Sequence, residues 1–407
     1  MNRAKVRTQL SENSIKVYED KNLQIIIAVT LMAVLGSSSI GPALPALAED
    51  FKIPPEQIGL VITAFVLPVA LGTPVFGVLA DRFGRKQILV PSLLLFTIAG
   101  AACAFAPNFR TLLEMRFLQG VGAASLESLA LTLISDLYNG KMLTAAMAFN
   151  GSMIGMSLAL YPLITGGLTT LGWRYVFLLP LSAIPVVLLV LFSLKTPKLQ
   201  NQQEFNLKAY LQNIWRSVNN RQVIGLLFAV VSLFILLFGA YFTYIPILAS
   251  DMGASDVVIG IILASMALSL AFVSSQLALF AKNLSELTLI KFSFVIYALA
   301  LVITPFLHNV WLLLIPSFLF GAAHGMVFPS TQALLGGLAP QEYRAGFMAV
   351  NATVLSLGQA LGPLLAGVAF GLWGMQGVFY SSAVFAIATL ALLSKIFAKK
   401  STLERIL

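Results

Sequence analysis

The sequence predicts an all-α membrane protein with twelve transmembrane helices arranged as two six-helix bundles. Of the 407 residues, 58% are hydrophobic and only 10% are charged, whereas soluble domains carry about 25% charged residues. Apolar runs long enough to cross a bilayer recur along nearly the whole chain. Residues of the first half also recur in the second half at one constant spacing. Together these observations predict two repeated bundles related by a pseudo-twofold axis along the membrane normal.

Each expected helix is a stretch of about 20 or more mostly apolar residues between polar turns. Gly and Pro residues inside such stretches are tolerated in membrane helices and often mark bends. The twelve stretches lie near 23–48, 57–80, 87–107, 110–138, 142–170, 174–194, 222–250, 256–281, 287–307, 309–338, 343–370 and 375–396.

Basic residues lie mostly on one side of the membrane in this arrangement. If the N-terminus is cytoplasmic, nearly all of the 25 Lys and Arg residues fall in cytoplasmic tails and connections. This asymmetry follows the positive-inside rule and predicts a multi-pass protein of the plasma (inner) membrane with both termini in the cytoplasm. Orientation and contact with anionic membrane lipids therefore explain the net charge of +9, and nucleic acid is excluded as a partner.

Five segments follow from the spans and their polar connections. They are expected to be a cytoplasmic tail, a six-helix bundle, a cytoplasmic linker, a second six-helix bundle and a cytoplasmic tail. The linker is expected to contain an amphipathic helix at the membrane surface, because apolar residues between Leu207 and Trp215 fall near one helical face. The segments are 1–22, 23–194, 195–221, 222–396 and 397–407.

A duplication relates the two bundles at a shift of 201 residues. Because six is an even number, both copies enter the membrane in the same sense, a plan in which transporters bind substrate between the halves near the midplane. The matched pairs include Pro45 and Pro246, Asp50 and Asp251, Gly59 and Gly260, Gly120 and Gly321, Asn150 and Asn351, and Pro162 and Pro363.

A charged turn, GVLADRFGRK (77–86), joins the second and third expected helices. Gly77 and Gly84 are expected to permit close backbone approach and a tight reversal. Asp81 needs a positive partner, such as the N-terminal end of a helix in the other half. The pattern resembles the signature loop of the major facilitator superfamily, at Gly77, Leu79, Asp81, Arg82, Gly84, Arg85 and Lys86.

Two further stretches resemble motifs of drug:proton antiporters in that superfamily. ALYPLITGGLTTLGWRYVF is similar to the fifth-helix antiporter motif, although Tyr161 stands where the motif has a Gly before Pro162. The resemblance covers essentially the whole chain and implies the two-bundle major facilitator fold. LLEMRFLQGVGAA looks like the fourth-helix motif R-x-x-Q-G-x-G, at Arg116, Gln119, Gly120 and Gly122.

The resemblance also implies a conformational latch on the cytoplasmic side. In the family the signature aspartate latches the halves in the outward-facing state. If this role applies to the present chain, Asp81 is expected to meet the start of the eleventh helix near Arg344. Arg85 and Asp136 are expected to complete a charge network. The second-half counterpart, 277–287, lacks the pattern, so the latch is expected to be one-sided. The assigned residues are Gly77, Asp81, Arg82, Gly84, Arg85, Lys86, Asp136 and Arg344.

Only two acidic residues, Glu114 and Glu127, fall well within an expected span. An ionisable group near the bilayer centre costs about 2.5–3.5 kcal/mol and normally faces the protein interior. Arg116 and Glu127 are eleven residues apart, about three helical turns, so they are expected to share a face that forms a wall of the central cavity. The proton-coupling candidates are Glu127, Arg116 and His324.

Several roles stay open for these residues. Glu127 can bind the proton, contact substrate or form a structural hydrogen bond, and Arg116 can neutralise a carboxylate or bind backbone carbonyls. His324 can titrate or serve as a packed, hydrogen-bonded residue. About half of the other polar groups are expected to bridge helices, with the equivalent Asn150 and Asn351 sharing a structural role. The cavity or substrate candidates are Gln119, Gly120, Tyr241, Tyr244, Asn150, Asn351, Gln332 and Gln359.

The expected function is secondary active transport by alternating access, with proton-coupled efflux of amphipathic drugs or small molecules. The alternatives are export of a specific metabolite, siderophore or sugar, and a non-transporting membrane receptor or lipid-handling protein. The chain lacks the G-x-x-x-x-G-K-[ST] and H-E-x-x-H patterns, and its lone Cys103 excludes cysteine-based metal sites, so neither an enzyme nor a cofactor is expected. The expected partners of this monomer are a small-molecule substrate, protons and membrane lipids.

Overall fold

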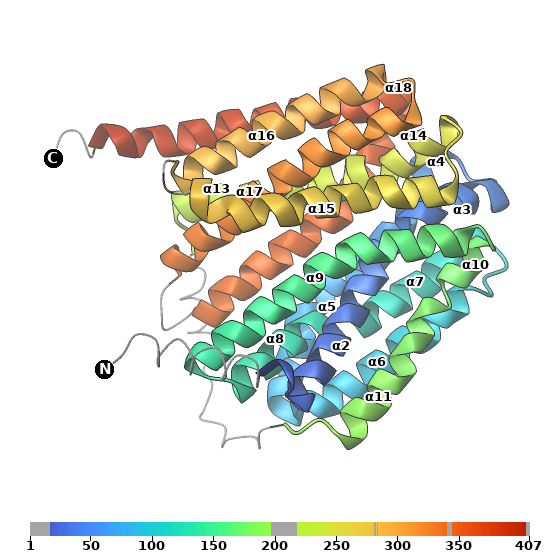
Figure 1. Ribbon diagram of the computed structural model, residues 1–407, viewed down its shortest axis with the longest axis vertical. Helices are drawn as coiled ribbons and strands as arrows, with labels where there is room; N and C mark the ends of the chain where they lie inside the picture. Colours follow the sequence, from blue (N-terminus) through green and yellow to red (C-terminus); the bar gives the residue numbers. More distant parts are fainter. Residues whose placement is uncertain (1–16, 197–217, 281, 283, 340–343, 404–407) are drawn as a thin grey trace.

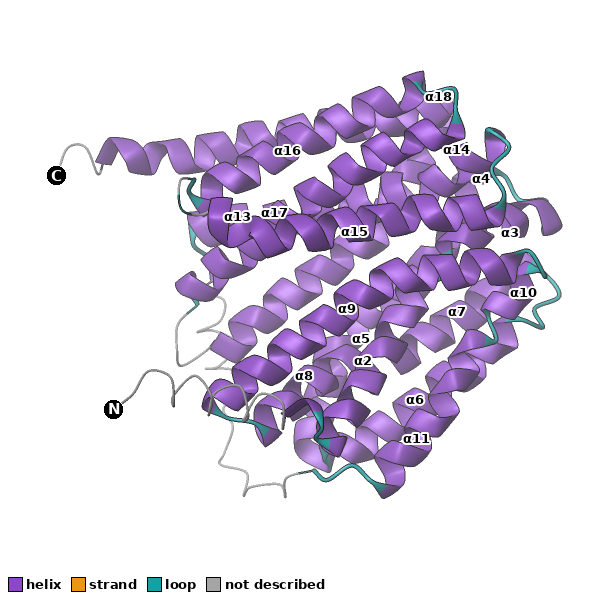
Figure 2. Ribbon diagram, in the orientation of Figure 1, coloured by secondary structure: helices purple, strands orange, loops and turns teal. Residues whose placement is uncertain are grey.

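The computed structural model describes residues 17–196, 218–280, 282, 284–339 and 344–403, and in this part of the chain helices are joined by short loops and turns, without strands (Figure 2). Eleven of the described segments are long and apolar enough to cross a membrane. The longest, Phe347–Phe397, contains Gly374 at φ 67° and ψ −165°, which breaks the helix into two spans. The chain therefore has the twelve-span, all-α fold that its hydropathy predicts.

The first six spans form the N-terminal half of the molecule, coloured blue to green in Figure 1. Several spans are built from two or three short helices in succession. The elements are α2 (Lys21–Ser38), η1 (Gly41–Ala43), α3 (Leu44–Asp50), α4 (Pro55–Ile58), α5 (Leu60–Phe83), α6 (Arg85–Cys103), α7 (Phe109–Ala123), α8 (Leu126–Leu137), α9 (Gly140–Thr169), α10 (Trp173–Val176), η2 (Leu179–Ser182) and α11 (Ala183–Phe192).

The last six spans form the C-terminal half, coloured yellow to red in Figure 1. Its first span contains a π-helical segment, η3, between two α-helices. The elements are α13 (Arg221–Leu236), η3 (Leu237–Tyr244), α14 (Ile245–Asp251), α15 (Asp256–Phe280), α16 (Glu286–Ile303), η4 (Thr304–Phe306), η5 (Val310–Leu313), α17 (Leu314–Leu338) and α18 (Arg344–Leu403).

The observed spans begin and end within a few residues of the expected ones. The last span ends at Phe397, one residue from the expected boundary at 396, and the helix α18 itself continues to Leu403. Residues 397–403 contain no Gly or Pro, so the helix extends past the apolar stretch that hydropathy detects. Residues 1–16 and most of the expected linker helix, 197–217, lie outside the described residues.

Equivalent close contacts show that the two halves repeat the same internal packing. A Cβ added to Gly120 would meet the backbone of Phe65, and a Cβ added to Gly321 would meet the backbone of Met266. Both glycines and both partners are separated by 201 residues. Such close approach of two helices requires a residue without a side chain, so the duplication in sequence is also a duplication in packing.

The two halves lie side by side with their spans roughly parallel (Figure 1). The start of α2 and the finish of α18 lie at the same end of the molecule, on the left of the figure; this is hereafter the terminal end. The short helices α3, α4, α10 and α14 lie at the opposite, distal end. The contacts between the halves differ between these ends.

Candidate functional site

At the distal end, each half places a glycine against a proline of the other half. A Cβ on Gly59 would meet Pro363, and a Cβ on Gly260 would meet the carbonyl of Pro162. Gly59 and Gly260 are equivalent at the shift of 201, and so are Pro162 and Pro363. The two contacts are therefore exchanged by the pseudo-twofold axis, as in a self-complementary interface between two copies.

A second mirrored pair of contacts lies beside the first. A Cβ on Gly166 would meet the backbone of Asp256 and Val257, and a Cβ on Gly367 would meet the carbonyl of Glu56. Gly166 and Gly367, and Glu56 and Val257, are again 201 residues apart. The contacts of Gly59, Gly166, Gly260 and Gly367 with the opposite half are hereafter the distal closure.

Two hydrogen bonds also join the halves at the distal end. The hydroxyl of Thr63 donates to the carbonyl of Ala360 at 3.0 Å, and the hydroxyl of Tyr244 donates to the carbonyl of Pro55 at 3.4 Å. Tyr244 was expected to line the central cavity, but it is buried in this contact and stacks on Phe370. Its observed place is therefore the distal closure.

The halves separate toward the terminal end. Gly155 and Gly166 are eleven residues apart on α9, about three turns, so they face the same way. Gly166 touches the opposite half, whereas a Cβ on Gly155 would have open space around it. Gly77, near the terminal end of α5, also has open space, so the expected close approach there is absent in this conformation. Between described residues, no hydrogen bond or ion pair joins the halves at this end.

The charged turn between α5 and α6 forms an ion-pair network within the N-terminal half. Arg85 pairs with Asp81 and, through Nε at 3.2 Å, with Asp136. Gly84 has a φ of 106°, which supplies the expected tight reversal. The Asp81 side chain is 67% exposed, and its described ion-pair partner lies in the same half. The terminal end is open, and an Asp81 latch across the halves stays a prediction.

The side chains of Arg82 and Lys86, two further residues of the expected latch, form no ion pair with other described residues in this conformation. The guanidinium of Arg82 lies 5.5 Å from the ring centroid of its neighbour Phe83. Lys86 is half-buried at the start of α6. Arg344 is the first residue of α18, but its side chain lies outside the part that the structure describes.

Arg116 ties three helices of the N-terminal half together. It is 2% exposed, and its guanidinium donates to the carbonyls of Val61 at 3.1 Å and Gly36 at 3.1 Å. It also donates to the side-chain oxygen of Gln119 at 2.8 Å and lies over the ring of Phe65. A buried cation needs such partners. Among the roles left open for Arg116, the structure shows the binding of backbone carbonyls.

Glu127 is exposed, whereas Arg116, eleven residues earlier on the same span, is buried; the common cavity face expected for the two residues stays a prediction. The fourth span is interrupted between α7 and α8, and the buried face of α8 runs through Leu126, Ala130 and Leu133. Glu127 is therefore exposed, and it makes no hydrogen bond or ion pair with other described residues. Gln119 and Gly120 were expected to line the cavity but are buried with Arg116 between helices.

His324 belongs to a cluster of aromatic rings inside the C-terminal half. Its ring is nearly parallel to that of Phe328, at 11° and 5.8 Å between centroids. Phe234 of α13 stands edge-on to both rings, at 5.7 and 5.9 Å. Nδ1 of buried His324 is 3.0 Å from the hydroxyl of Tyr297. Phe234, His324 and Phe328 are hereafter the aromatic triad.

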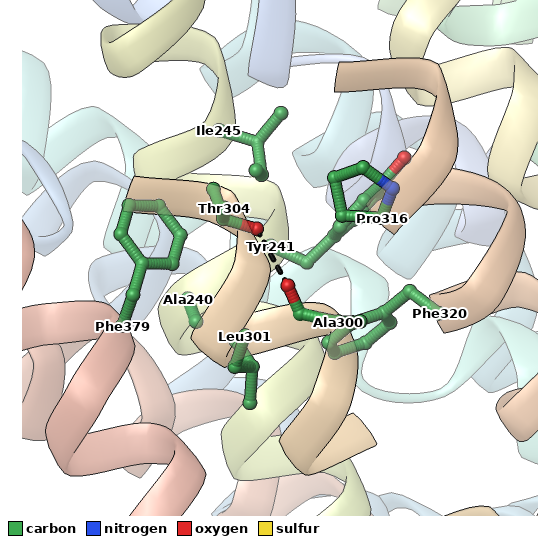
Figure 3. A pocket seen from close by; sticks show the side chains of 9 residues that line it. All are labelled: Ala240, Tyr241, Ile245, Ala300, Leu301, Thr304, Pro316, Phe320 and Phe379. Carbon is green, nitrogen blue, oxygen red and sulfur yellow. Dashed lines mark hydrogen bonds between the residues drawn. The ribbon is translucent and has the colours of Figure 1, made fainter. Parts of the chain in front are cut away.

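Tyr241 is also part of the interior of the C-terminal half. Its hydroxyl donates to the carbonyl of Ile262 at 3.1 Å. With Phe320 and Phe379 it lines a small void among η3, α16, α17 and α18 (Figure 3). Every element around this void belongs to the C-terminal half. Tyr241 therefore does not line a space between the halves, as had been expected.

The equivalent amides bridge helices through different partners. Asn150 accepts a hydrogen bond from the hydroxyl of Thr30 at 2.8 Å, which joins α9 to α2. Asn351 donates to the side-chain oxygen of Gln332 at 2.9 Å, which joins α18 to α17. The Asn351 Oδ1 is buried and has no partner among the described residues. Gln359 is half-buried on α18.

The sequence profile of the Major Facilitator Superfamily matches residues 26–307 and 247–405, nearly the whole chain. The protein belongs to this superfamily. Its fold is similar to that of a bacterial homolog of the human lysosomal transporter Spinster, crystallised in an inward-facing and occupied conformation. The two structures agree with a TM-score of 0.78 over 93% of this chain and 97% of the other, at 16% sequence identity.

Relatives of this superfamily member include named exporters. The multi-drug resistance efflux pump PmrA of Streptococcus pneumoniae is 28% identical over 89% of this chain and 92% of its own. The bacillibactin exporter of Bacillus subtilis is 35% identical, but the match spans only 30% of this chain and 31% of the exporter. Membership identifies this superfamily member as a multi-pass membrane transporter of small molecules rather than an enzyme.

The distal closure is the feature of this superfamily member that its sequence does not reveal directly. The shift of 201 matches Gly59 with Gly260 and Pro162 with Pro363. Nothing within one copy indicates that each glycine contacts the proline of the other copy. The available signal is that both copies retain a small residue and its partner, because a symmetric close contact requires both.

Proposed function

We propose that this protein is a secondary transporter that works by alternating access and exports amphipathic small molecules in exchange for protons. The observation that carries the proposal is Glu127, an uncovered carboxylate in the middle of a membrane span. An ionised group facing lipid at that depth is unfavourable by about 2.5–3.5 kcal/mol. We therefore place Glu127 at the water-filled space between the two halves, where α8 has no helix packed on it.

The proposed orientation puts the terminal end in the cytoplasm of a cell bounded by a plasma (inner) membrane. With that orientation, the closed distal end and open terminal end correspond to an inward-open state. The five proposed segments keep the expected order, with the linker 195–221 on the cytoplasmic surface between the halves. A single chain contains both halves and the space between them, so the working unit is a monomer.

Proton exchange requires a carboxylate that holds a proton in one state and releases it in the other. In the proposed cycle, Glu127 takes a proton from the external side when the distal closure opens and cargo leaves. The halves then rock, and Glu127 releases the proton to the cytoplasm through the open terminal end. Asp81 and Arg344 join the halves when that end closes. Arg116 and His324 support the two halves structurally.

The test is gradient-driven transport by purified protein in liposomes with Glu127→Gln. The variant keeps the side-chain shape and removes the titratable group, so we expect export driven by a pH gradient to fall at least tenfold. Glu114→Gln is the matched control, because Glu114 is on the same span but paired with Arg110 at 3.0 Å and exposed. Unchanged gradient-driven export by Glu127→Gln in folded protein would remove proton coupling from this residue.

Export of one specific metabolite is a second candidate, favoured by the similarity to the bacillibactin exporter over 30% of the chain. The same liposomes distinguish the two candidates. Competition by many unrelated amphipathic compounds supports a drug exporter. Inhibition by one chemical class alone supports a dedicated exporter.

A further inference from the structure

The first span of the C-terminal half holds one residue more than its counterpart in the N-terminal half. Both spans begin with the same cap, because the side chains of Asp20 and Asn220 each accept a hydrogen bond from the backbone N–H two residues later, at 2.8 and 2.9 Å. These caps are 200 residues apart, whereas Pro45 and Pro246, farther along the same spans, are 201 apart. The second copy therefore contains one additional residue between these points.

The buried faces of the two spans agree with this change of register. Nine of the ten buried residues of α13 match a buried residue of α2 at a shift of 200, but only five match at a shift of 201. Beyond η3, the helices α3 and α14 begin and end at a shift of 201. The π-helical η3 lies between these two registers. Because a π-helix bonds residue i to residue i+5, η3 absorbs the additional residue and leaves both flanks in the packing of the repeat.

One side of η3 is in contact with the distal closure. A Cβ on Gly239 would meet the backbone of Gly362, the residue before Pro363, which itself touches the opposite half. Tyr244, the last residue of η3, donates to the carbonyl of Pro55 across the halves. The π-helical segment therefore touches both the helix that carries a closure proline and the opposite half directly.

Another side of η3 borders the small void inside the C-terminal half (Figure 3). Ala240 and Tyr241 of η3 and Ile245 of α14 line this void, together with residues of α16, α17 and α18. The lining of a void lacks contacts on one side, so η3 can move toward it at little loss of packing. Long π-helices are rare in proteins, so tertiary contacts rather than local preference hold this one.

We propose that η3 is a hinge of the distal end, π-helical while that end is closed and α-helical when it opens. The inference rests on the proposed alternating access and adds a moving part to it. As an α-helix, the segment with its additional residue turns α14 relative to α13 by one residue position, about 100°. This rotation carries Tyr244 away from Pro55. The first span of the N-terminal half has a 3₁₀ turn, Gly41–Ala43, near the equivalent place, so the hinge belongs to one half.

The first test measures the length of this span in the full-length protein with Cys103 replaced by serine. Spin labels replace the exposed residues Arg221 and Asp251 at its ends. Gly260→Val is expected to supply distal-open molecules, because it directs a side chain at the carbonyl of Pro162. A wider helix rises less per residue, so the labelled distance should be longer in Gly260→Val by about 1.5 Å, the rise of one α-helical residue.

Labels at Trp311 and Leu338, exposed residues at the ends of the tenth span, are the control and should report the same distance in both proteins. An equal Arg221–Asp251 distance in closed and open molecules overturns the hinge.

The second test deletes Ala240, which removes the additional residue and leaves both flanks in their present packing. The span then becomes a continuous α-helix without a second form. Combined with Gly260→Val, the deletion should lower the distal-open population by roughly fivefold or more relative to Gly260→Val alone. Labels at the exposed residues Lys52 and Ser255 measure this population across the distal end.

Deletion of Val230, buried in the regular helix α13, is the matched control and should lower the yield of folded protein, because it turns part of a buried face outward. If deletion of Ala240 lowers that yield as severely, the assignment of the additional residue to η3 is overturned.

The outcomes separate the hinge from the proposed function. A longer span in Gly260→Val, together with fewer distal-open molecules after deletion of Ala240, supports the hinge. A distal-open population that the deletion leaves unchanged overturns the hinge and keeps alternating access. A distal end that stays closed in Gly260→Val rejects alternating access at this closure and the hinge with it.

Discussion

The distal and terminal ends of the molecule use the duplication in different ways. At the distal end, Gly59 and Gly260 make mirrored contacts with Pro363 and Pro162. At the terminal end, the charged network of Asp81, Arg85 and Asp136 lies in one half, and residue 282, equivalent to Asp81, is a lysine. The distal end closes through symmetric backbone contacts. The terminal end has a charged network in the N-terminal half alone.

The difference has a steric cause. Where two backbones touch, the absence of a side chain is a requirement in both copies, so a substitution in either copy separates the helices. Where side chains face water or cargo, no such requirement holds and the copies can diverge. Glu127 and Phe328 are an example, since equivalent positions carry a carboxylate and an aromatic ring.

A substitution that breaks a mirrored glycine–proline contact of the distal closure should change the population of distal-open molecules the most. Gly260→Val directs a branched side chain at the carbonyl of Pro162, and overpacking of this kind costs about 1–3 kcal/mol. We expect the distal-open population to rise roughly tenfold or more. Spin labels at Lys52 and Ser255, with Cys103 replaced by serine, report the change as a longer distance across the distal end.

Gly155→Val is the control for this experiment, because Gly155 has open space around it. The mirrored variant Gly59→Val should shift the population as strongly as Gly260→Val. A large difference between the two glycine variants would show that the closure is not symmetric in energy.

A smaller effect is expected from removing one of the two hydrogen bonds that join the halves at the distal end, neither of which has a mirrored equivalent. Thr63 donates to Ala360, whereas the equivalent positions, Ala264 and Ala159, cannot form this bond. Thr63→Val should weaken the closure by about 1 kcal/mol, a roughly fivefold change in population. The same pair of spin labels measures it. Thr73→Val is the control, since Thr73 bonds to Ala124 within its own half, and an equal shift in that variant would contradict the assignment.

The smallest change in conformational population is expected from a substitution at the terminal end. Asp81→Asn removes the charge proposed to join the halves when that end closes, so the terminal-open population should rise about two- to threefold, as suits an exposed ion pair. Labels at the exposed, equivalent positions Phe83 and Leu284 monitor the opening. Lys282→Asn, at the position equivalent to Asp81, should have no effect. A distance distribution that is the same with and without the Asp81 charge would argue against the latch.

Much of the fold can be predicted from the sequence because its signals are local or periodic. Hydropathy locates the spans to within a few residues. The repeat at a shift of 201 residues shows which positions of the two halves are equivalent. The different burial of Arg116 and Glu127 on one span could not be predicted, because it depends on which helices pack against each part of that span. Gly77 was expected in a close contact, but its surroundings depend on the conformation of the whole molecule.

By itself, the sequence determined that the chain crosses a membrane twelve times in two related sets, because burial of an apolar span in lipid depends only on its length and composition. Tertiary structure alone decided which polar groups are satisfied and which are uncovered. Arg116 is enclosed by carbonyls of two other helices, and Glu127 is left open beside the interruption in its span. Such contacts join residues far apart in the chain, and their partners exist only after the helices pack.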